Sequence, residues 1–577
     1  MHTFEVWAPA ADNVKVKLAG GLHALQRDEH GWWRLEMDQA RPGDDYAFVL
    51  NDDATALPDP RSAFQPFGVH GPSRIVDHNA FFWTDQGWQA PPLSSAVIYE
   101  LHIGTFTPKG TFESTIERLG HLVDLGVTHI EIMPVNEFPG DRGWGYDGVD
   151  LYAPHHAYGG PDGLKRLVDA CHAHGLAVLL DVVYNHLGPV GNYLGRFSPY
   201  FTTTYETPWG SAVNLDGPGS SEVRRFFCDN ARMWLRDYHF DGLRLDAVHA
   251  FFDRSAIHFL EQLATEIDAL ESHLHRHLVL IAESDLNQPA VVRPREAFGF
   301  GIDAQWSDDF HHALHTVLTG ERTGYYSDFG SLGDLAKALK SVFVYDGAYS
   351  EFRKRVHGRP VVKLPASQFL GYLQNHDQIG NRATGDRSSR LMNTRRLKIG
   401  AALVLLSPFV PMLFQGEEFA ASSPFQYFTG HDDSQIAHAI SEGRRNEFAA
   451  FGWNPRDVPD PQSRETFQRS KLNWQEVSAF PHRELLDWHK RLIALRRSSG
   501  DLTNGCLDDV TVEFDEKNGN LTLRRGAFTV ISNFAAASLA VTITERDEIV
   551  LASDKGIARV STSVSIPPES VVVLRRA

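Results

Sequence analysis

Eight short apolar runs, most of them followed by a segment with helical periodicity, are spread along this 577-residue chain. Such runs are typical of strands buried on both faces, and strands that alternate with helices form parallel sheets. Eight units favour a closed (β/α)8 TIM barrel over an open doubly wound sheet. No G-x-G-x-x-G motif opens the first unit, which disfavours a dinucleotide-binding sheet. The predicted strands are 97–101, 128–135, 177–184, 243–246, 278–282, 304–310, 369–373 and 410–414, and the predicted helices are 112–125, 164–174, 222–238, 256–270, 335–342, 396–406 and 485–495.

Two regions with the alternating pattern of exposed β-strands flank these units. Residues 1–90 alternate apolar and polar positions between turns rich in Asp, Asn, Gly and Pro. Residues 500–577 return to this pattern, and Asn518-Gly519 is typical of a two-residue hairpin turn. We therefore expect an immunoglobulin-like β-sandwich over 1–90, the barrel with short insertions over 91–499, and a second β-sandwich over 500–577.

Charge, hydrophobicity and cysteine content limit which binding partners and which cellular compartment we expect. The formal charge is −18, from 55 Lys and Arg against 73 Asp and Glu, which disfavours a nucleic-acid partner. No apolar stretch reaches the roughly 18 residues of a membrane helix, so we expect no membrane partner. Cys171, Cys228 and Cys506 are too widely spaced for a disulfide framework and suit a reducing compartment. Residues 1–5 lack the start of a secretion signal, so we expect a cytoplasmic protein; the oligomeric state is left open.

Polar residues follow several of the predicted strands. In a (β/α)8 barrel the carboxyl ends of the strands form the active site, so side chains at these ends converge on one cavity. The third strand ends in Asp181 and leads to His186, the fourth contains Arg244 and Asp246, and the fifth is followed by Glu283. The seventh is followed by His376 and Asp377.

The carboxylates among these residues indicate glycoside hydrolysis. Arg244 and Asp246 are two positions apart on a strand, so they point to the same face, and the arginine favours an ionised, nucleophilic Asp246. Glu283 comes from the next strand, where crowding with like charges favours the protonated form of a general acid. Two carboxyls about 5 Å apart form the retaining machinery, whereas the inverting one needs a wider gap. Sequence does not measure this gap.

Each of these residues also has a possible role outside catalysis. Arg244 and Asp246 could form a structural ion pair, His186 and His376 could be buried histidines, and Glu283 could be solvated in a loop. Rims of Asp, His and Glu also bind metals, although the chain has no H-E-x-x-H motif. The joint occurrence of these residues at strand ends on one face favours a catalytic site over these alternatives.

Aromatic residues follow several of the same strands. Trp144 and Tyr146 lie in a Gly-rich segment after the second strand. Other predicted strand-following segments contain Tyr205, Trp209, Trp306 and Phe310. Because the C–H face of a sugar packs on a flat ring, these side chains suit a carbohydrate groove. Ordinary core or loop packing is the alternative for each one.

Four segments resemble the α-amylase family of glycoside hydrolases, in the order in which that family carries them. The resemblance extends over essentially the whole chain and implies a TIM barrel flanked by β domains. It implies Asp246 as nucleophile, Glu283 as general acid/base and Asp377 as transition-state stabiliser. Tyr146, His186, Arg244 and His376 match family positions that line the subsite of the cleaved sugar. The segments are Asp181–His186, Gly242–Val248, Ile281–Ser284 and Leu373–Asp377.

Further segments are similar to one subgroup of this family, which hydrolyses the α-1,4 bond next to the terminal trehalose of maltooligosyltrehalose. They are Asp246–Ala250, Glu283–Asn287, Gln305–His312 and 425–453. This resemblance implies a maltooligosyltrehalose substrate and no cofactor. The segment after His186 is short, which argues against the calcium-bridged insertion of many amylases, so we predict no required metal. Candidates for the leaving-group side are Trp209, Asp308, Asp309 and His311, each with a structural role as the alternative.

Three other functions are weighed against this one. A 1,4-α-glucan branching enzyme would transfer a glucan to a sugar hydroxyl instead of to water, and a less specific α-amylase-type hydrolase would not select trehalose. An inactive glucan-binding protein is disfavoured because Asp246, Glu283 and Asp377 are all present. The segments after the nucleophile and after the acid favour the trehalose-releasing hydrolase.

Overall fold

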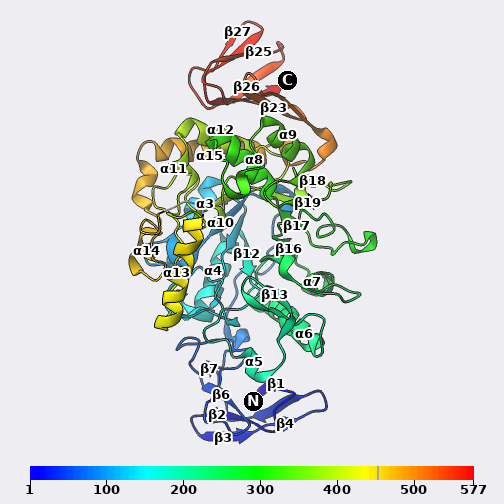
Figure 1. Ribbon diagram of the computed structural model, residues 1–577, viewed down its shortest axis with the longest axis vertical. Coiled ribbons are helices and arrows are strands. Elements are labelled where there is room, and N and C mark those ends of the chain that lie inside the picture. The colour runs from blue at the N-terminus through cyan, green and yellow to red at the C-terminus, as the bar shows by residue number, and fades with distance from the viewer. Residues whose placement is uncertain (451–453) are drawn as a thin grey trace.

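The computed structural model describes residues 1–450 and 454–577 as three parts along one long axis (Figure 1). Antiparallel sheets of the N-terminal part lie at one end, a closed barrel lies in the middle, and the C-terminal sheets lie at the other end. Residues 451–453, the end of the family-like segment 425–453, lie outside the described residues. No helix in the described part of the chain is both long and apolar enough to cross a membrane.

The middle part confirms the predicted (β/α)8 barrel. Eight strands close in the order β12-β15-β16-β17-β20-β21-β8-β9, and every pair is parallel. All eight are buried along their length, as expected for strands with helices outside and side chains inside. Their bounds are β8 (Ile98–Leu101), β9 (His129–Ile132), β12 (Ala177–Val182), β15 (Gly242–Leu245), β16 (Val279–Ala282), β17 (Ala304–Trp306), β20 (Phe369–Gly371) and β21 (Val410–Phe414).

The barrel interior has an apolar layer below a polar one. Ile98, Leu179, Ile281 and Met412 belong to one buried apolar cluster inside the barrel. Because side chains alternate along a strand, the interior positions two residues further on lie nearer the carboxyl ends. These positions include the charged side chains Glu100, Asp181 and Arg244 and the carboxyl group of Glu283.

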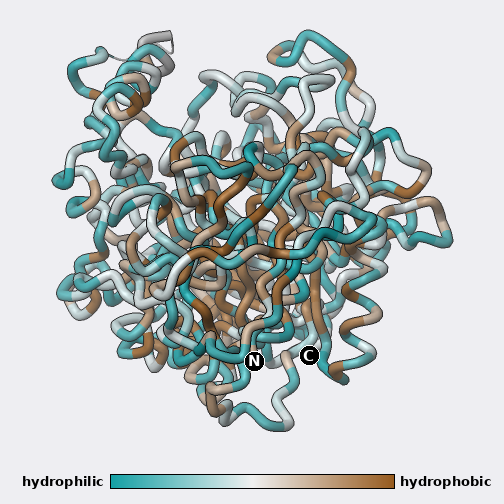
Figure 2. The backbone as a smooth tube through the Cα atoms, turned by 90° about the horizontal axis from the view of Figure 1, so that it is seen from below, coloured by the Kyte–Doolittle hydropathy of each residue, from teal (hydrophilic) through white to brown (hydrophobic). Residues whose placement is uncertain are grey.

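Helices surround the strands and turn their apolar faces inward, so the hydrophobic stretches gather inside the molecule and the outer loops are hydrophilic (Figure 2). Capping side chains define several helix starts, such as Ser331, which accepts a hydrogen bond from the backbone of Asp334. The helices are α1 (Ile103–Phe106), α2 (Phe112–Ile116), α3 (Leu119–Leu125), α4 (Gly160–Ala173), α5 (Leu194–Phe197), α6 (Ser220–Asp237), α7 (Phe259–Leu274), α8 (Asp308–Thr319), α9 (Leu332–Ser341), α10 (His376–Gly380), α11 (Ser388–Leu391), α12 (Thr394–Leu405), α13 (Ser434–Ala450), α14 (Arg464–Arg469), α15 (His482–Arg497) and α16 (Gly500–Thr503).

Two of the predicted elements differ from the structure. The sixth strand was expected to run over 304–310, but β17 ends at Trp306 and α8 begins at Asp308. Two acidic residues in the first turn of α8 favour a helix start there, because they face the positive end of the helix dipole. The single helix expected over 112–125 is two helices, α2 and α3, separated at residues 117–118.

Three two-stranded hairpins project from the barrel. Tyr146 lies between the strands of the first hairpin, Trp209 in the turn of the second, and Arg353 in the turn of the third. Each hairpin thus brings a side chain to the carboxyl-end face from a part of the chain without barrel strands. The hairpins are β10 (Asn136–Glu137) with β11 (Asp150–Pro154), β13 (Phe201–Thr207) with β14 (Gly210–Val213), and β18 (Asp346–Ser350) with β19 (Arg355–Gly358).

The two ends of the chain form antiparallel sheets around separate apolar cores. The N-terminal strands are β1 (His2–Trp7), β4 (Gln26–Arg27) and β5 (Trp32–Met37) in one sheet, and β2 (Val14–Leu18), β3 (Gly21–Ala24), β6 (Asp45–Leu50) and β7 (Ser73–Arg74) in the other. The C-terminal strands are β22 (Val510–Asp515), β23 (Asn520–Arg525), β24 (Phe528–Asn533), β26 (Asp547–Ala552) and β29 (Ser570–Arg576) in one sheet, and β25 (Leu539–Thr542), β27 (Ala558–Val560) and β28 (Ser563–Ile566) in the other.

Polar contacts attach both end parts to the barrel. The guanidinium of Arg525 on β23 donates to the backbone oxygens of Leu406 and Ser407, at 3.1 and 2.6 Å, directly after α12. At the other end, Arg61 forms an ion pair with Asp229 on α6 at 2.9 Å. Because an unpartnered buried donor is costly, the Arg525 contacts fix the C-terminal sheet against the barrel.

We expect Gly242→Ala to destabilise the protein. A Cβ atom at position 242 would lie 2.4 Å from the backbone oxygen of Val279 and 2.9 Å from the Leu179 side chain, inside the barrel below Arg244. Overpacking of this kind costs about 1–3 kcal/mol. Thermal unfolding followed by circular dichroism should give a lower midpoint for this variant.

Gly120→Ala is the matched control for this substitution. Gly120 lies in α3, is exposed, and has no atom within 4 Å of the added Cβ. Alanine in a helix is favoured over glycine by roughly 0.5–1 kcal/mol, so this midpoint should rise slightly. Equal midpoints for the two variants would contradict the tight packing at the barrel strand.

Candidate active site

The guanidinium of Arg244 joins carboxylates from three neighbouring strands. Its Nη1 donates to both oxygens of Asp181, at 2.8 and 2.7 Å, and to Oδ1 of Asp246 at 2.9 Å. Its Nη2 forms an ion pair with Oε2 of Glu283 at 2.9 Å. The register explains this convergence, because Asp181 on β12 and Ile281 on β16 are the direct neighbours of Arg244 on β15. The predicted proximity of Asp246 and Glu283 therefore rests on a shared cation.

Burial and the neighbouring carboxylates have opposite effects on the pKa of Arg244. Arg244 is fully buried, and the Trp306 ring lies 4.2 Å from the guanidinium carbon. Burial alone would lower the arginine pKa, but the charges of Asp181 and Glu283 raise it well above its ordinary value. Burial raises the pKa of Asp181 to about 7, although the charge of Arg244 works against this shift. The guanidinium thus stays charged throughout the working pH range.

Strained backbone connects the two candidate catalytic carboxylates. Ala247, the residue after Asp246, has a φ of 40° and lies in the left-handed region. Residues other than glycine rarely adopt this conformation, and it is frequent at functional sites. Here it turns the Ala247 N–H toward Glu283, which accepts a 2.8 Å hydrogen bond at Oε2. The backbone after Asp246 therefore helps to orient the carboxyl of Glu283.

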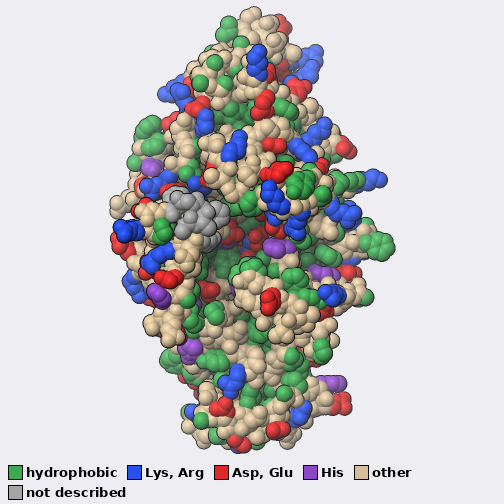
Figure 3. Space-filling view, in the orientation of Figure 1, with side chains coloured by type: hydrophobic (Ala, Val, Ile, Leu, Met, Phe, Trp, Pro, Cys, Tyr) green, Lys and Arg blue, Asp and Glu red, His purple; other side chains and the backbone are tan. Residues whose placement is uncertain are grey.

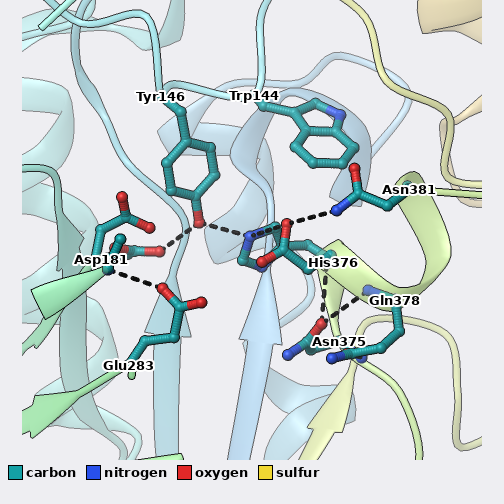
Figure 4. Close-up of polar contacts among 12 residues, drawn as sticks. Trp144, Tyr146, Asp181, Glu283, Asn375, His376, Gln378 and Asn381 are labelled. Carbon is teal, nitrogen blue, oxygen red and sulfur yellow. Dashed lines mark hydrogen bonds and ion pairs between the residues drawn. The ribbon is translucent and has the colours of Figure 1, made fainter. Parts of the chain in front are cut away.

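Tyr146 and His376 form the opposite wall of the site (Figure 4). The Tyr146 hydroxyl donates to Oδ2 of Asp181 at 2.5 Å and lies 2.8 Å from Nε2 of His376. The two rings stack with their centres 5.1 Å apart. Tyr146 comes from the first hairpin and His376 from the segment after β20, so residues far apart in the sequence meet across the barrel mouth.

Asp377 stands beside His376 at the start of the short helix α10. The side chain of Asn375 accepts hydrogen bonds from the backbone N–H groups of Asp377 and Gln378, which fixes this turn. Asp377 lies 3.5 Å from Nε2 of His376, and 36% of its side-chain surface is exposed. It thus adds a further carboxylate at the mouth, and this one is open to a ligand.

His186 and Trp209 lie together on another side of the mouth. Their rings stack with centres 4.6 Å apart and an interplanar angle of 8°. Burial lowers the pKa of His186, so this imidazole is neutral. Trp209 keeps 48% of its surface exposed in the turn between β13 and β14. An exposed ring whose other face is held by a stacked histidine is suited to stacking against a sugar.

Figure 3 shows acidic side chains gathered in a hollow near the middle of this face, over the barrel. The hollow is rimmed by hydrophobic and cationic side chains. A neutral, hydroxyl-rich ligand suits such a surface, because carboxylates accept hydrogen bonds from hydroxyl groups.

Of the four candidates for the leaving-group side, two lie near the site and two do not. Trp209 and Asp308 lie near the site; Asp308 accepts a hydrogen bond from Tyr372 at 2.7 Å. Burial, and to a lesser degree the charges of Glu283 and Asp377, raises the pKa of Asp308 to about 7.

Asp309 and His311 do not face the site, contrary to the expectation from the sequence. Asp309 accepts hydrogen bonds from the backbone of Val344 and Tyr345 and from the side chain of Asn287. Both ring nitrogens of His311 are occupied, by the backbone oxygen of Leu373 and by the Tyr326 hydroxyl. The reason is the early start of α8, which turns both side chains into the protein. We therefore assign them structural roles.

Sequence reasoning missed several residues that shape this site. Glu100 contacts His376 from β8, and nothing in the motif pattern singles it out. Arg353, in the turn of the third hairpin, pairs with Asp285 at 2.9 Å, and His357 contacts the Asp285 backbone oxygen at 2.7 Å. Of these residues, only Asp285 could be singled out from the sequence, because it follows the end of a predicted strand.

One cluster among the described residues has the composition of a metal site. Glu137, His155 and His156 place ligand atoms within 4.8 Å of one another. Glu137 already accepts hydrogen bonds from Nδ1 of His156 at 2.7 Å and from its backbone N–H at 2.9 Å. These hydrogen bonds account for Glu137 and His156 without a metal ion. The metal alternative at the barrel mouth is disfavoured, because Arg244 occupies the position between the carboxylates where a cation would bind.

The barrel and its carboxylates define a glycosidase of the α-amylase class. The family model "Alpha amylase, catalytic domain" matches residues 73–199. A solved Salmonella typhimurium protein that carries the name alpha amylase superposes with a TM-score of 0.91 at 38% identity, covering 100% of this chain and 97% of that one.

Curated relatives identify the group within this class. The malto-oligosyltrehalose trehalohydrolase of Rhizobium sp. (strain M-11) is 48% identical, covering 99% of this chain and 97% of the relative. The enzyme of the same name from Mycobacterium tuberculosis is also 48% identical, over the full length of both chains. The chain belongs to the malto-oligosyltrehalose trehalohydrolase family, and the predicted resemblance is confirmed.

Proposed function

We propose that this chain hydrolyses the α-1,4-glucosidic bond next to the terminal trehalose of maltooligosyltrehalose. The products are trehalose and a maltooligosaccharide. The contact of Asp246 and Glu283 with one guanidinium is the observation that carries this proposal, since it holds two carboxyls from adjacent strands close together. Retaining glycosidases need such a pair at about 5–5.5 Å. The names of the relatives support the substrate.

Asp246 is the proposed nucleophile. Its Oδ1 accepts a 2.9 Å hydrogen bond from Arg244, which holds the carboxylate at the end of the strand, toward the mouth. In the first step a carboxylate oxygen bonds to the anomeric carbon while the bond from this carbon to the trehalose oxygen breaks. The glucan chain then remains on Asp246 as a glycosyl ester.

Glu283 is the proposed general acid and base. In the first step its proton passes to the departing oxygen of trehalose. In the second step it takes a proton from water, the water oxygen bonds to the anomeric carbon, and Asp246 is released. The hydrogen bond from Ala247 holds one carboxyl oxygen and leaves the other for this proton transfer.

Asp377 and His376 are proposed to stabilise the transition state. The sugar ring gains positive charge as the bond breaks, and an open carboxylate beside the ring lowers the energy of this charge. Asp377 is exposed at the mouth and held at the start of α10. His376 and Tyr146 are placed to bind hydroxyls of the same sugar. None of these steps uses a cofactor.

The leaving-group side is proposed to lie around Trp209. Its exposed ring provides a stacking face beside His186. Asp285 lies two residues after Glu283, in the segment after β16, and pairs with Arg353 of the third hairpin. Because the acid protonates the departing oxygen, groups near Glu283 are the ones that meet trehalose.

The proposed place of action is the cytoplasm. The free thiols of Cys171 and Cys228 are buried, and burial raises the pKa of each, which keeps them unreactive. Cys506 is partly exposed and unpaired. A reducing compartment maintains such thiols.

We expect Asp246→Asn and Glu283→Gln each to lower kcat by about 1,000-fold or more, because each removes a group that acts in bond breaking. Circular dichroism and thermal unfolding should differ little from wild type. Asp162→Asn, at an exposed position on α4, is the control and should keep full activity. Near-normal turnover by either catalytic variant would contradict the assigned roles.

Product analysis on two substrates tests the proposed function. Purified enzyme is given maltotetraosyl trehalose and maltohexaose in parallel, and products are separated by chromatography. We expect free trehalose from the first substrate and much slower cleavage of the second. Equal cleavage would indicate a less specific α-amylase, and new α-1,6 branches on amylose would indicate a branching enzyme.

Trp209→Ala should weaken use of the trehalose-ended substrate. Loss of an aromatic face costs about 0.5–1.5 kcal/mol, so kcat/KM should fall roughly 3- to 10-fold. Phe82→Ala, which removes another ring with 80% of its surface exposed, is the control and should leave kcat/KM unchanged. An unchanged kcat/KM for Trp209→Ala would place the leaving group elsewhere.

A further inference from the structure

A buried carboxylate lies directly below His376. Glu100 comes from the interior of β8 and is 1% exposed. One of its oxygens lies 2.5 Å from Nδ1 of His376, and the other accepts a hydrogen bond from the His376 backbone N–H at 3.1 Å. Both oxygens of Glu100 thus hold one residue, in its ring and in its backbone.

This contact begins a continuous chain of polar contacts that ends at the proposed nucleophile. Nε2 of His376 lies 2.8 Å from the Tyr146 hydroxyl, which donates to Asp181 at 2.5 Å. Asp181 accepts from Arg244, which also binds Asp246. A group that fixes the charge and orientation of the imidazole therefore acts on every contact from His376 to Asp246.

We infer that Glu100 is a positioning residue for the proposed hydrolysis: it orients the His376 ring and keeps it as a doubly protonated imidazolium. With Nδ1–H directed to Glu100, the other N–H of the cation faces Tyr146 and Asp377 at the mouth. The site then holds a second cation opposite Arg244. This inference rests on the proposed function, because its effect is measured on that reaction.

The charges around His376 support the cationic form. Burial disfavours a charged imidazole, but the charges of Glu100 and Asp377 and the hydrogen bond to Glu100 outweigh it and raise the pKa of His376 to about 9. The charge of Arg244 lowers this pKa. The titratable and charged groups that face His376 are Glu100 on β8, Glu131 on β9, His102 after β8, Tyr146, Asp181 on β12, Arg244 on β15 and Asp377 on α10.

A second glutamate beside Glu100 provides a matched control. Glu131 on β9 is the direct register neighbour of Glu100 and is fully buried. Neither of its carboxyl oxygens has a hydrogen-bond partner among the described residues. Burial and the charge of Glu100 raise its pKa well above the ordinary value, so it is a neutral acid. Glutamine at 131 imitates this state, whereas glutamine at 100 removes a charge.

The test is the pH dependence of kcat/KM on maltotetraosyl trehalose for Glu100→Gln, Glu100→Asp and Glu131→Gln. At each pH the value for the variant is divided by that for the wild type. Glu100 is the main group that opposes burial at His376, so the pKa of His376 should fall without it and the imidazole should lose its proton at a lower pH than in the wild type. For Glu100→Gln we expect this ratio to fall by about 10-fold or more between about pH 5.5 and about pH 8.

The other two variants separate charge from packing. Glu100→Asp keeps the charge, so its ratio should be below one but constant with pH. The ratio for Glu131→Gln should stay near one at every pH. A ratio for Glu100→Gln that is constant or rises with pH would overturn the inference, and so would an equal fall for Glu131→Gln.

Two further outcomes are informative. If Glu100→Gln fails to fold, Glu100→Asp carries the test, and a ratio for it that falls with pH shows that the retained charge does not matter and overturns the inference. A wild-type enzyme that does not release trehalose counts against the proposed function. An active wild type with a constant ratio for Glu100→Gln counts against the role of Glu100 alone.

Discussion

The buried guanidinium of Arg244 is the interaction on which the site depends. A charge without solvent inside a barrel is costly unless partners surround it. Asp181, Asp246 and Glu283 provide these partners from three adjacent strands. The strands must therefore stay in register for the charge to be compensated, which links the packing of the barrel to the geometry of the carboxylates.

The rest of the mouth is arranged around this ion cluster. Trp306 lies under the guanidinium, and Tyr146 reaches Asp181 from a hairpin outside the barrel. His376 continues the contacts to Glu100 on β8, so polar groups encircle the mouth above the apolar interior layer. The apolar layer inside the barrel lowers the local polarity and so strengthens each of these electrostatic contacts. The open side of the mouth leaves room for a sugar.

Sequence reasoning succeeded where local pattern and fold are directly connected. Short apolar runs predicted the eight strands, and the residues after them predicted Asp246, Glu283 and Asp377 at one mouth. It failed at 304–310, where the aromatic Phe310 lies past the strand end but acidic residues begin α8. That shift turned Asp309 and His311 into the protein, where they bind the chain itself.

The sequence by itself determined the barrel and the carboxylates at its mouth, because buried strands and the polar residues that end them are encoded by neighbouring positions. Only the tertiary structure decided which of these groups share one cation and which additional residues support them. Glu100 and His376 are 276 residues apart and meet because β21 closes the barrel onto β8. Trp209 and Arg353 reach the mouth through hairpins whose direction no local pattern encodes. Contacts of this kind arise from ring closure and loop packing, which depend on the whole chain.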